Sequence, residues 1–125
     1  MKEDRKTFDF KDNKLGLMVT YYSYRDRLAV LCIKDGELYS DITINLPDKL
    51  TELPNYAFID GFAKDSGLEK TLIKIGVIKE VIEKDVQYNM GKYDKVAFDF
   101  DVLREYDPIG LEEYLDVKLP FMKGI

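Results

Sequence analysis

Hydrophobic and polar positions alternate most regularly between Leu28 and Leu46, on either side of the sequence Lys34-Asp35-Gly36-Glu37. Asp-Gly between two strand-like runs is a strong signal for a β-hairpin. The first run, residues 28–33, is apolar throughout and is typical of a strand buried on both faces. The second run places Leu38, Ser40, Ile42, Ile44 and Leu46 on one face and Tyr39, Asp41, Thr43 and Asn45 on the other. We predict that this hairpin is the centre of the fold.

The hairpin continues a pattern that begins earlier in the chain. Residues 15–24 alternate as a strand, and the charged residues 25–27 predict a turn into the hairpin. Together these segments indicate a three-stranded antiparallel meander over residues 15–46. Residues 7–10 predict a short strand at its edge.

The second half of the chain mixes strand and helix patterns. Residues 56–60 predict a short strand and residues 61–67 a loop, with Asp65 or Ser66 capping a helix that ends at Gly76. Apolar pairs at 77–78 and 81–82 recur at helical spacing, but the β-branched residues around them and the turn signal at 89–91 favour a hairpin that pairs 79–88 with 93–100. This second hairpin is our prediction, with a helix as the alternative.

The C-terminal region predicts two helix starts. Asp101 is expected to cap a short helical turn, and Asp107 followed by Pro108 is typical of the start of a C-terminal helix. The fold class is therefore α+β: a mainly antiparallel sheet of five or six strands built on the central meander, with one helix on a face and a short C-terminal helix. Residues 1–125 are expected to form a single domain, with 1–6 and 118–125 loosely packed.

Composition narrows the possible chemistry. The chain has no His and one Cys, which excludes a structural zinc site and the common His-dependent catalytic triads. Cys32 lies in the most apolar run, where a buried, inert thiol is expected. With no apolar segment of signal-peptide or membrane-span length, we expect a cytoplasmic protein that binds no membrane. Neither a cofactor nor a metal is expected.

Acidic residues are concentrated near the C-terminus. Between residues 99 and 116 the only base is Arg104, against seven acids: Asp99, Asp101, Glu105, Asp107, Glu112, Glu113 and Asp116. Such a segment could form a negative surface that engages a basic groove on a partner. The alternative is that these carboxylates cap helices and otherwise face solvent. The scattered bases and the pI of about 4.8 disfavour direct binding of nucleic acid.

Tyrosines form the second candidate surface. If the meander pairs as predicted, Tyr22, Tyr24 and Tyr39 share one face with small polar residues. Exposed tyrosines are typical of protein-binding surfaces because they supply rigid area and a hydrogen-bonding tip. The alternative is that a helix or the C-terminal tail covers them.

A catalytic alternative rests on paired carboxylates. Asp99 and Asp101 would share a strand face near Lys95, and Asp60 lies near Asp65 in the sequence. A metal-dependent nuclease needs carboxylates and a nearby lysine of this kind, but the spacing is common in an acidic chain. We therefore assign no catalytic residue and keep a metal-dependent enzyme as the alternative function.

Three segments resemble a known family: Thr43-Ile44-Asn45-Leu46-Pro47, Asn55-Tyr56-Ala57-Phe58-Ile59-Asp60 with the following short helix to Gly76, and Val96-Ala97-Phe98-Asp99-Phe100. Over about residues 15–105 the chain is similar to small bacterial proteins of unknown function carried by conjugative elements and phages. The family has no agreed catalytic residues, so the resemblance implies a setting on mobile elements and no site.

These observations favour a non-enzymatic protein. We expect it to bind a host or defence protein through its acidic or tyrosine surface, in the sharpest form as an anti-CRISPR type inhibitor that occupies a nucleic-acid groove. A structural homodimeric subunit is a further alternative. The sequence does not indicate the oligomeric state.

Overall fold

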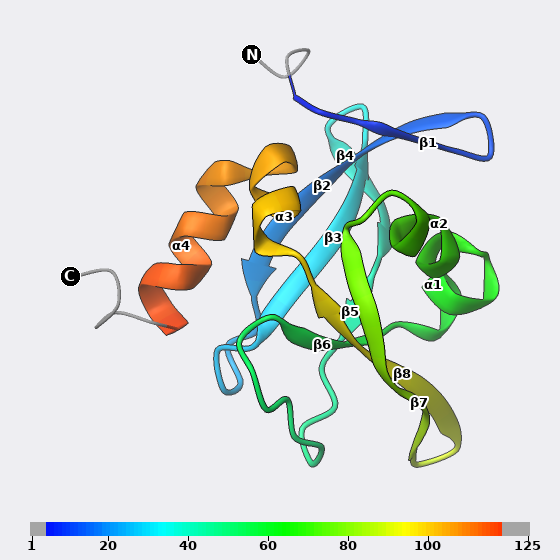
Figure 1. Cartoon of the computed structure of the whole chain (residues 1–125), viewed down its shortest axis with the longest axis vertical. Helices are drawn as coiled ribbons and strands as arrows, with labels where there is room; N and C mark the ends of the chain where they lie inside the picture. The colour runs from blue at the N-terminus through cyan, green and yellow to red at the C-terminus, as the bar shows by residue number, and fades with distance from the viewer. Residues whose placement is uncertain (1–4, 119–125) are drawn as a thin grey trace.

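The first of two antiparallel sheets is built from the N-terminal third of the chain. The computed structural model describes residues 5–118, and in it β1 (Phe8–Phe10), β2 (Asn13–Tyr21), β3 (Leu28–Lys34) and β4 (Glu37–Asp41) pair in the order β1-β2-β3-β4 (Figure 1). The turn residues Asp35 and Gly36 both have positive φ, 53° and 82°, as a two-residue hairpin turn requires. The predicted meander and its short edge strand are confirmed.

The second sheet follows from a break in the strand that was predicted to run to Leu46. It consists of β5 (Thr43–Ile44), β6 (Tyr56–Ile59), β7 (Ile78–Tyr88) and β8 (Gly91–Phe98), in the order β5-β6-β8-β7. Ile42 is the corner: its N–H donates to Val30 O of the first sheet, and its carbonyl accepts from Asp60 N beyond β6. The α+β class is confirmed, whereas one sheet of five or six strands is wrong because the chain changes sheets here.

Residues 5–118 contain four helices, whereas the sequence predicted a helix ending at Gly76, a short helical turn after residue 101 and a C-terminal helix. The four helices are α1 (Gly61–Asp65), α2 (Leu68–Lys74), α3 (Phe100–Tyr106) and α4 (Pro108–Lys118). The segment 61–67 is not simply a loop, because the Asp60 side chain accepts from Phe62 N and caps α1. The cap of α3 is Asp99, which accepts from the backbone N–H groups of Asp101 and Val102, so the prediction of Asp101 as the cap is wrong. The predicted second hairpin, β7–β8, is confirmed.

One hydrophobic core lies between the two sheets and the helices. The inner face of the first sheet contributes alternate residues of β2 and the buried side of β3, including Leu15, Leu17 and Val30, each no more than 1% exposed. Phe98 and Ile59 enter from the second sheet, while α2, α3 and α4 close the sides. None of the helices within residues 5–118 combines the length and apolarity needed to cross a membrane.

The junction of α3 and α4 packs against the edge of β2 and supplies a hydrogen-bond acceptor for its backbone. Asp107 is buried, and its Oδ2 accepts from the backbone N–H of Val19 at 2.9 Å while its Oδ1 accepts from Gly110 N at 3.1 Å. A Cβ at Gly110 would lie only 2.2 Å from the carbonyl oxygen of Val19, so the helix approaches the strand closely because this residue is glycine. The predicted role of Asp107 at the start of the C-terminal helix is supported by its bond to Gly110.

A β-bulge in β4 reverses part of the predicted face pattern. Cys32 pairs with Ser40 and Ile33 pairs with Leu38, so Tyr39 is an extra residue opposite β3. Leu38 is consequently 61% exposed, and Tyr39 packs partly buried against the core. The prediction that Leu38 shares the buried face with Ser40 and that Tyr39 faces outward is therefore wrong.

The chain ends are described in part. Arg5 and Lys6 are held by ion pairs to Asp107 and Glu105, and Lys118 donates to Arg25 O. These three residues belong to the two end segments that were expected to be loosely packed. The rest of the two segments, residues 1–4 and 119–125, lies outside the described residues.

Candidate functional site

The three tyrosines expected to share a face are separated in the structure. Tyr22 follows the end of β2 and its hydroxyl hydrogen-bonds to Thr43 Oγ1 at 2.9 Å, partly buried. Tyr39 lies at the other end of that strand, where its hydroxyl accepts from the Asn13 side chain at 3.5 Å. Tyr24 is 48% exposed and lies against the Arg25 guanidinium. Tyr22 and Tyr39 therefore make their contacts near opposite ends of β2, so the three tyrosines do not gather into a single surface.

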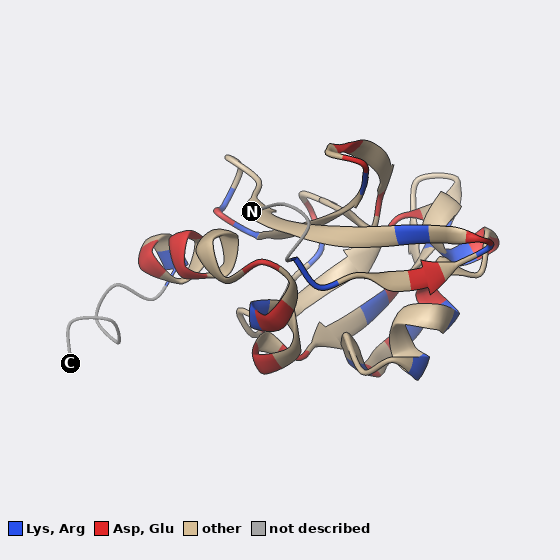
Figure 2. Ribbon diagram, turned by 90° about the horizontal axis from the view of Figure 1, so that it is seen from above, with Lys and Arg blue, Asp and Glu red and all other residues tan. Residues whose placement is uncertain are grey.

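The acidic C-terminal region is partly neutralised by its neighbours. Arg104 pairs with Asp101 and Glu112, and Glu105 pairs with Lys6. Figure 2 shows red and blue segments side by side on α3 and α4. Glu113 and Asp116 are exposed on α4. A local charge of −6, read from the sequence alone, overstates the field here because Arg5, Lys6 and Lys118 come from outside the segment.

The remaining two acids of this region, Asp99 and Asp107, are occupied by the backbone. Oδ1 of Asp99 accepts from Asp101 N and Val102 N, and both carboxylate oxygens of Asp107 accept from backbone N–H groups. Lys95, which would complete a catalytic set with Asp99, instead donates to both carboxylate oxygens of Glu52 at 2.9 and 3.0 Å. Within residues 5–118 no group of three or more acidic or thiol side chains is arranged to hold a metal ion.

An apolar surface that the sequence pattern did not reveal lies on the solvent side of the first sheet. We call it the outer sheet face, and it consists of Met18, Leu31, Ile33 and Leu38. Strand register joins them, since Met18 pairs with Leu31 and Ile33 pairs with Leu38. Met18 is 40% and Leu38 61% exposed, and the other two are half-buried. The bulge at Tyr39 creates this surface by turning Leu38 outward.

Acidic side chains border the outer sheet face along β4. Asp41 is exposed and pairs in register with Leu31, and Glu37 is exposed beside Leu38. Asp35 adds a third carboxylate in the turn, whereas the nearest base, Lys34, donates to Asn13 Oδ1 at 2.7 Å. The combination of exposed apolar groups with an acidic border is suited to a partner that presents apolar groups beside basic ones.

The most strongly perturbed carboxyl group belongs to Glu69 in α2. Its side chain is buried and hydrogen-bonds to Asp94 of β8. Burial, this hydrogen bond and the negative charge of Asp94 raise the pKa of Glu69 to about 7. Lys64 of α1 donates to Asp94 at 3.0 Å and to Asp85 of β7 at 2.8 Å. The group joins two helices to the β7–β8 hairpin. Because Glu69 and Asp94 are only 6% and 2% exposed, they are closed to a substrate and act as structural links.

Sequence reasoning could have found Glu69 but not the outer sheet face. Glu69 lies three positions before Leu72 and so shares the buried face of α2, which marks it as a buried acid. Nothing in the sequence places a bulge at Tyr39, because the alternation through Ile42 continues without interruption.

The fold and this surface define a small α+β domain with an exposed apolar sheet face. Residues 16–117 match the family described as Domain of unknown function (DUF4313), and the chain belongs to it. No curated protein and no solved structure matches the chain. The family membership extends the region of resemblance inferred from the sequence motifs through α4.

Proposed function

We propose that this protein is a non-enzymatic binding protein that engages a partner protein through the outer sheet face. The observation that carries the proposal is the outward position of Leu38 beside Ile33 and Met18. A β-bulge that turns a leucine into solvent is unfavourable in a protein that binds nothing at this surface, because exposed apolar area is more stable when it is buried. Bulges that re-aim a side chain are common features next to functional sites.

The acidic border supports a partner protein with a basic surface. Asp35, Glu37 and Asp41 favour a protein surface in which apolar groups are flanked by lysine or arginine. Proteins that bind nucleic acid carry such basic grooves. The most specific form of the proposal is that the chain is an accessory protein of a mobile genetic element that occupies the groove of a host or defence nuclease, as an anti-CRISPR inhibitor does. The resemblance to proteins of conjugative elements and phages motivates this form.

The test compares two variants at exposed apolar positions. Leu38→Ser removes the most exposed apolar side chain of the outer sheet face, and Ile109→Ser, on α4, is the matched control because Ile109 is similarly exposed at 69%. Purified basic nucleases are assayed for binding to each variant by biolayer interferometry. We expect Leu38→Ser to weaken binding about tenfold or more, as loss of an apolar anchor at an interface does, and Ile109→Ser to bind as the wild type does.

Salt dependence and oligomeric state complete the test. If the acidic border contributes, binding weakens as ionic strength rises, and nucleic acid competes with the protein for the nuclease. Light scattering of the free protein tests whether a second copy of the chain binds the outer sheet face. A dimer that Leu38→Ser dissociates would contradict the proposal and favour a homodimeric subunit. Equal binding by both variants would also contradict it.

A further inference from the structure

Arg27 is a buried cation that has no acidic partner among residues 5–118. It precedes β3 and is 6% exposed. Its Nη1 donates to the carbonyl oxygen of Leu46 at 2.9 Å and to Asn45 Oδ1 at 3.2 Å. None of the ion pairs among residues 5–118 involves it. Burial, and then the neighbouring charge of Arg25, lower the pKa of the Arg27 guanidinium, which is the direction expected for a buried charge without compensation.

The unused donors of Arg27 form one edge of the guanidinium. Nε and Nη2 have no hydrogen-bond partner among the described residues, yet no enclosed side-chain nitrogen or oxygen in that range lacks one. Both atoms therefore retain contact with the surface. The Nε–Nη2 edge is one of the two edges through which arginine binds a carboxylate or phosphate with two parallel hydrogen bonds.

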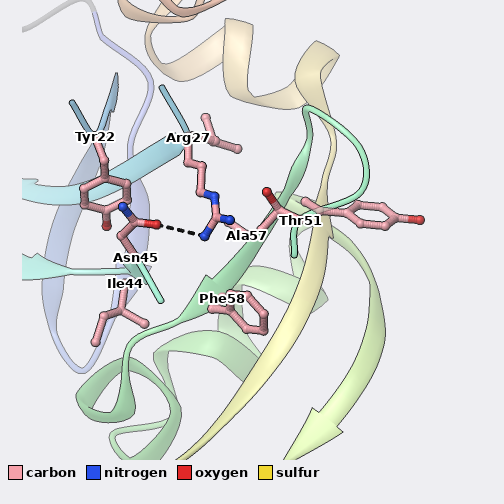
Figure 3. Close-up of a pocket in the computed structure, with 9 residues that line it drawn as sticks. Tyr22, Arg27, Ile44, Asn45, Thr51, Ala57 and Phe58 are labelled. Carbon is pink, nitrogen blue, oxygen red and sulfur yellow. Dashed lines mark hydrogen bonds between the residues drawn. The ribbon is translucent and has the colours of Figure 1, made fainter. Parts of the chain in front are cut away.

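Arg27 lines a small pocket. Its other walls come from both sheets and from the loop between β5 and β6, and include Tyr22, Asn45, Thr51, Tyr56 and Phe58. Figure 3 shows the guanidinium in the middle of these side chains, with Asn45 on one side and the Thr51 hydroxyl on another. The lining leaves no room for an enclosed water molecule, so a ligand must contact the guanidinium from the open side of the pocket.

We propose that Arg27 is the anchor of an oxyanion site, and that the ligand is a carboxylate or phosphate group held by the Nε–Nη2 edge between Asn45 and Thr51. The ligand supplies a negative charge to a guanidinium that has no acidic side chain beside it among the described residues. A buried charge without a counter-ion is costly, and an anion that binds there removes the cost. This site is separate from the outer sheet face, so each is tested independently.

The probes are sodium formate, for a carboxylate, and inorganic phosphate, each titrated against sodium chloride at constant ionic strength. At a ceiling of about 1.5 kcal/mol per non-hydrogen atom, formate binds no tighter than about millimolar and phosphate no tighter than about micromolar. Formate is therefore titrated to about 0.1 M, which is roughly a hundred times that limit, to obtain a clear rise in the unfolding temperature. We expect a saturable rise with one or both probes, accompanied by a shift of the Arg27 Nε–Hε resonance in ¹⁵N NMR spectra. The stronger of the two responses identifies the ligand class.

Two arginines of the same turn provide the matched comparison. Arg27→Gln should abolish the response to the anion, whereas Arg25→Gln, at an exposed position, should retain it. If Arg27→Gln does not fold, Thr51→Asp still tests the site, because a carboxylate at the pocket wall can pair with the free edge. We expect Thr51→Asp to raise the unfolding temperature and to remove the anion response, while its isosteric control Thr51→Asn does neither.

Two results would overturn the proposal. One is a response to formate and phosphate no larger than that to chloride in the wild-type protein. The other is a stability of Thr51→Asp equal to or below that of Thr51→Asn, because an uncompensated guanidinium must gain from a nearby carboxylate.

Discussion

The side chains of Glu69 and Asp94 hydrogen-bond to each other inside the protein, although both carry carboxyl groups. Two carboxylates in contact cannot both be charged without strong repulsion, so the pair holds a proton. Burial alone would raise the pKa of Asp94, but hydrogen bonds from Asp85 N, Glu69 and Lys64 outweigh it and lower the pKa. The proton therefore resides on Glu69. Lys84 of β7 also acts on this group by lowering the Glu69 pKa.

The first prediction is a loss of stability as the pH rises through neutrality. Because folding raises the pKa of Glu69 from 4.5 to about 7, its stabilising contribution is complete below about pH 4.5 and is lost as the pH passes about 7. Glu69→Gln mimics the protonated acid. We expect the free energy of unfolding of Glu69→Gln to change little between about pH 5 and 8. At pH 8 this variant should be more stable than the wild type by on the order of 2 kcal/mol.

Urea denaturation at a series of pH values measures this effect. Glu80→Gln is the control, because Glu80 lies exposed on β7. The lowered pKa of Asp94 acts in the opposite direction, but only when acid protonates it below its ordinary value of 3.8. A wild-type curve that rises or stays level from about pH 5 to 8 would contradict a proton on Glu69.

The second prediction concerns Asp107. Asp107→Ala removes the acceptor for the buried N–H of Val19 and the bond to Gly110 N at the start of α4. An unsatisfied buried donor and a lost helix cap together cost about 2 to 4 kcal/mol, and chemical denaturation measures it. Glu113→Ala, on the exposed side of α4, should change stability by less than about 0.5 kcal/mol. Equal effects of the two substitutions would show that Asp107 does not join the helices to β2.

The third prediction compares two leucines of the first sheet. Leu38→Ala should change the free energy of unfolding by less than about 0.5 kcal/mol, because the side chain is 61% exposed. Leu15→Ala should cost about 2 to 5 kcal/mol, because Leu15 is fully buried. A large loss of stability in Leu38→Ala would indicate that Leu38 is buried, as simple alternation along the strand predicts, and would contradict the bulge at Tyr39.

The fourth prediction is that Cys32 resists alkylation. Its side chain is fully buried, and burial raises the pKa of the thiol to about 12, so almost no thiolate forms at pH 8. Iodoacetamide followed by mass spectrometry should leave the native protein unmodified and label it fully in denaturant. Labelling of the native protein at a rate near that of a free thiol would contradict this burial.

Local signals in the sequence predict much of the first sheet and of the second hairpin. Asp35-Gly36 determines a turn on its own, because positive φ at both positions is readily adopted only by such residues. Gly76, with φ of 86°, ends the α2 segment for the same reason. The two-sided apolar pattern of β3 is only partly right about burial, because Val30 and Cys32 are buried on one face whereas Leu31 and Ile33 on the other face are half-buried.

Long-range pairing decides what the sequence pattern leaves open. Ile42 belongs to both sheets through partners 12 and 18 residues away, and alternation along the chain contains no sign of that division. The charge of the C-terminal helices is likewise altered by Arg5 and Lys6, which are about a hundred residues distant in sequence. A buried arginine such as Arg27 is equally hidden, since its surroundings come from both sheets and a loop.

The bond between Asp107 and Val19 joins positions 88 residues apart. During synthesis, β1 to β4 leave the ribosome long before α4 exists, so the nascent meander carries an unpaired backbone edge beside β2. Only the last helices to emerge can cover that edge. A ribosome that stalls before Asp107 would therefore release a chain with a complete first sheet and an open flank, which is a state prone to pairing with other strands.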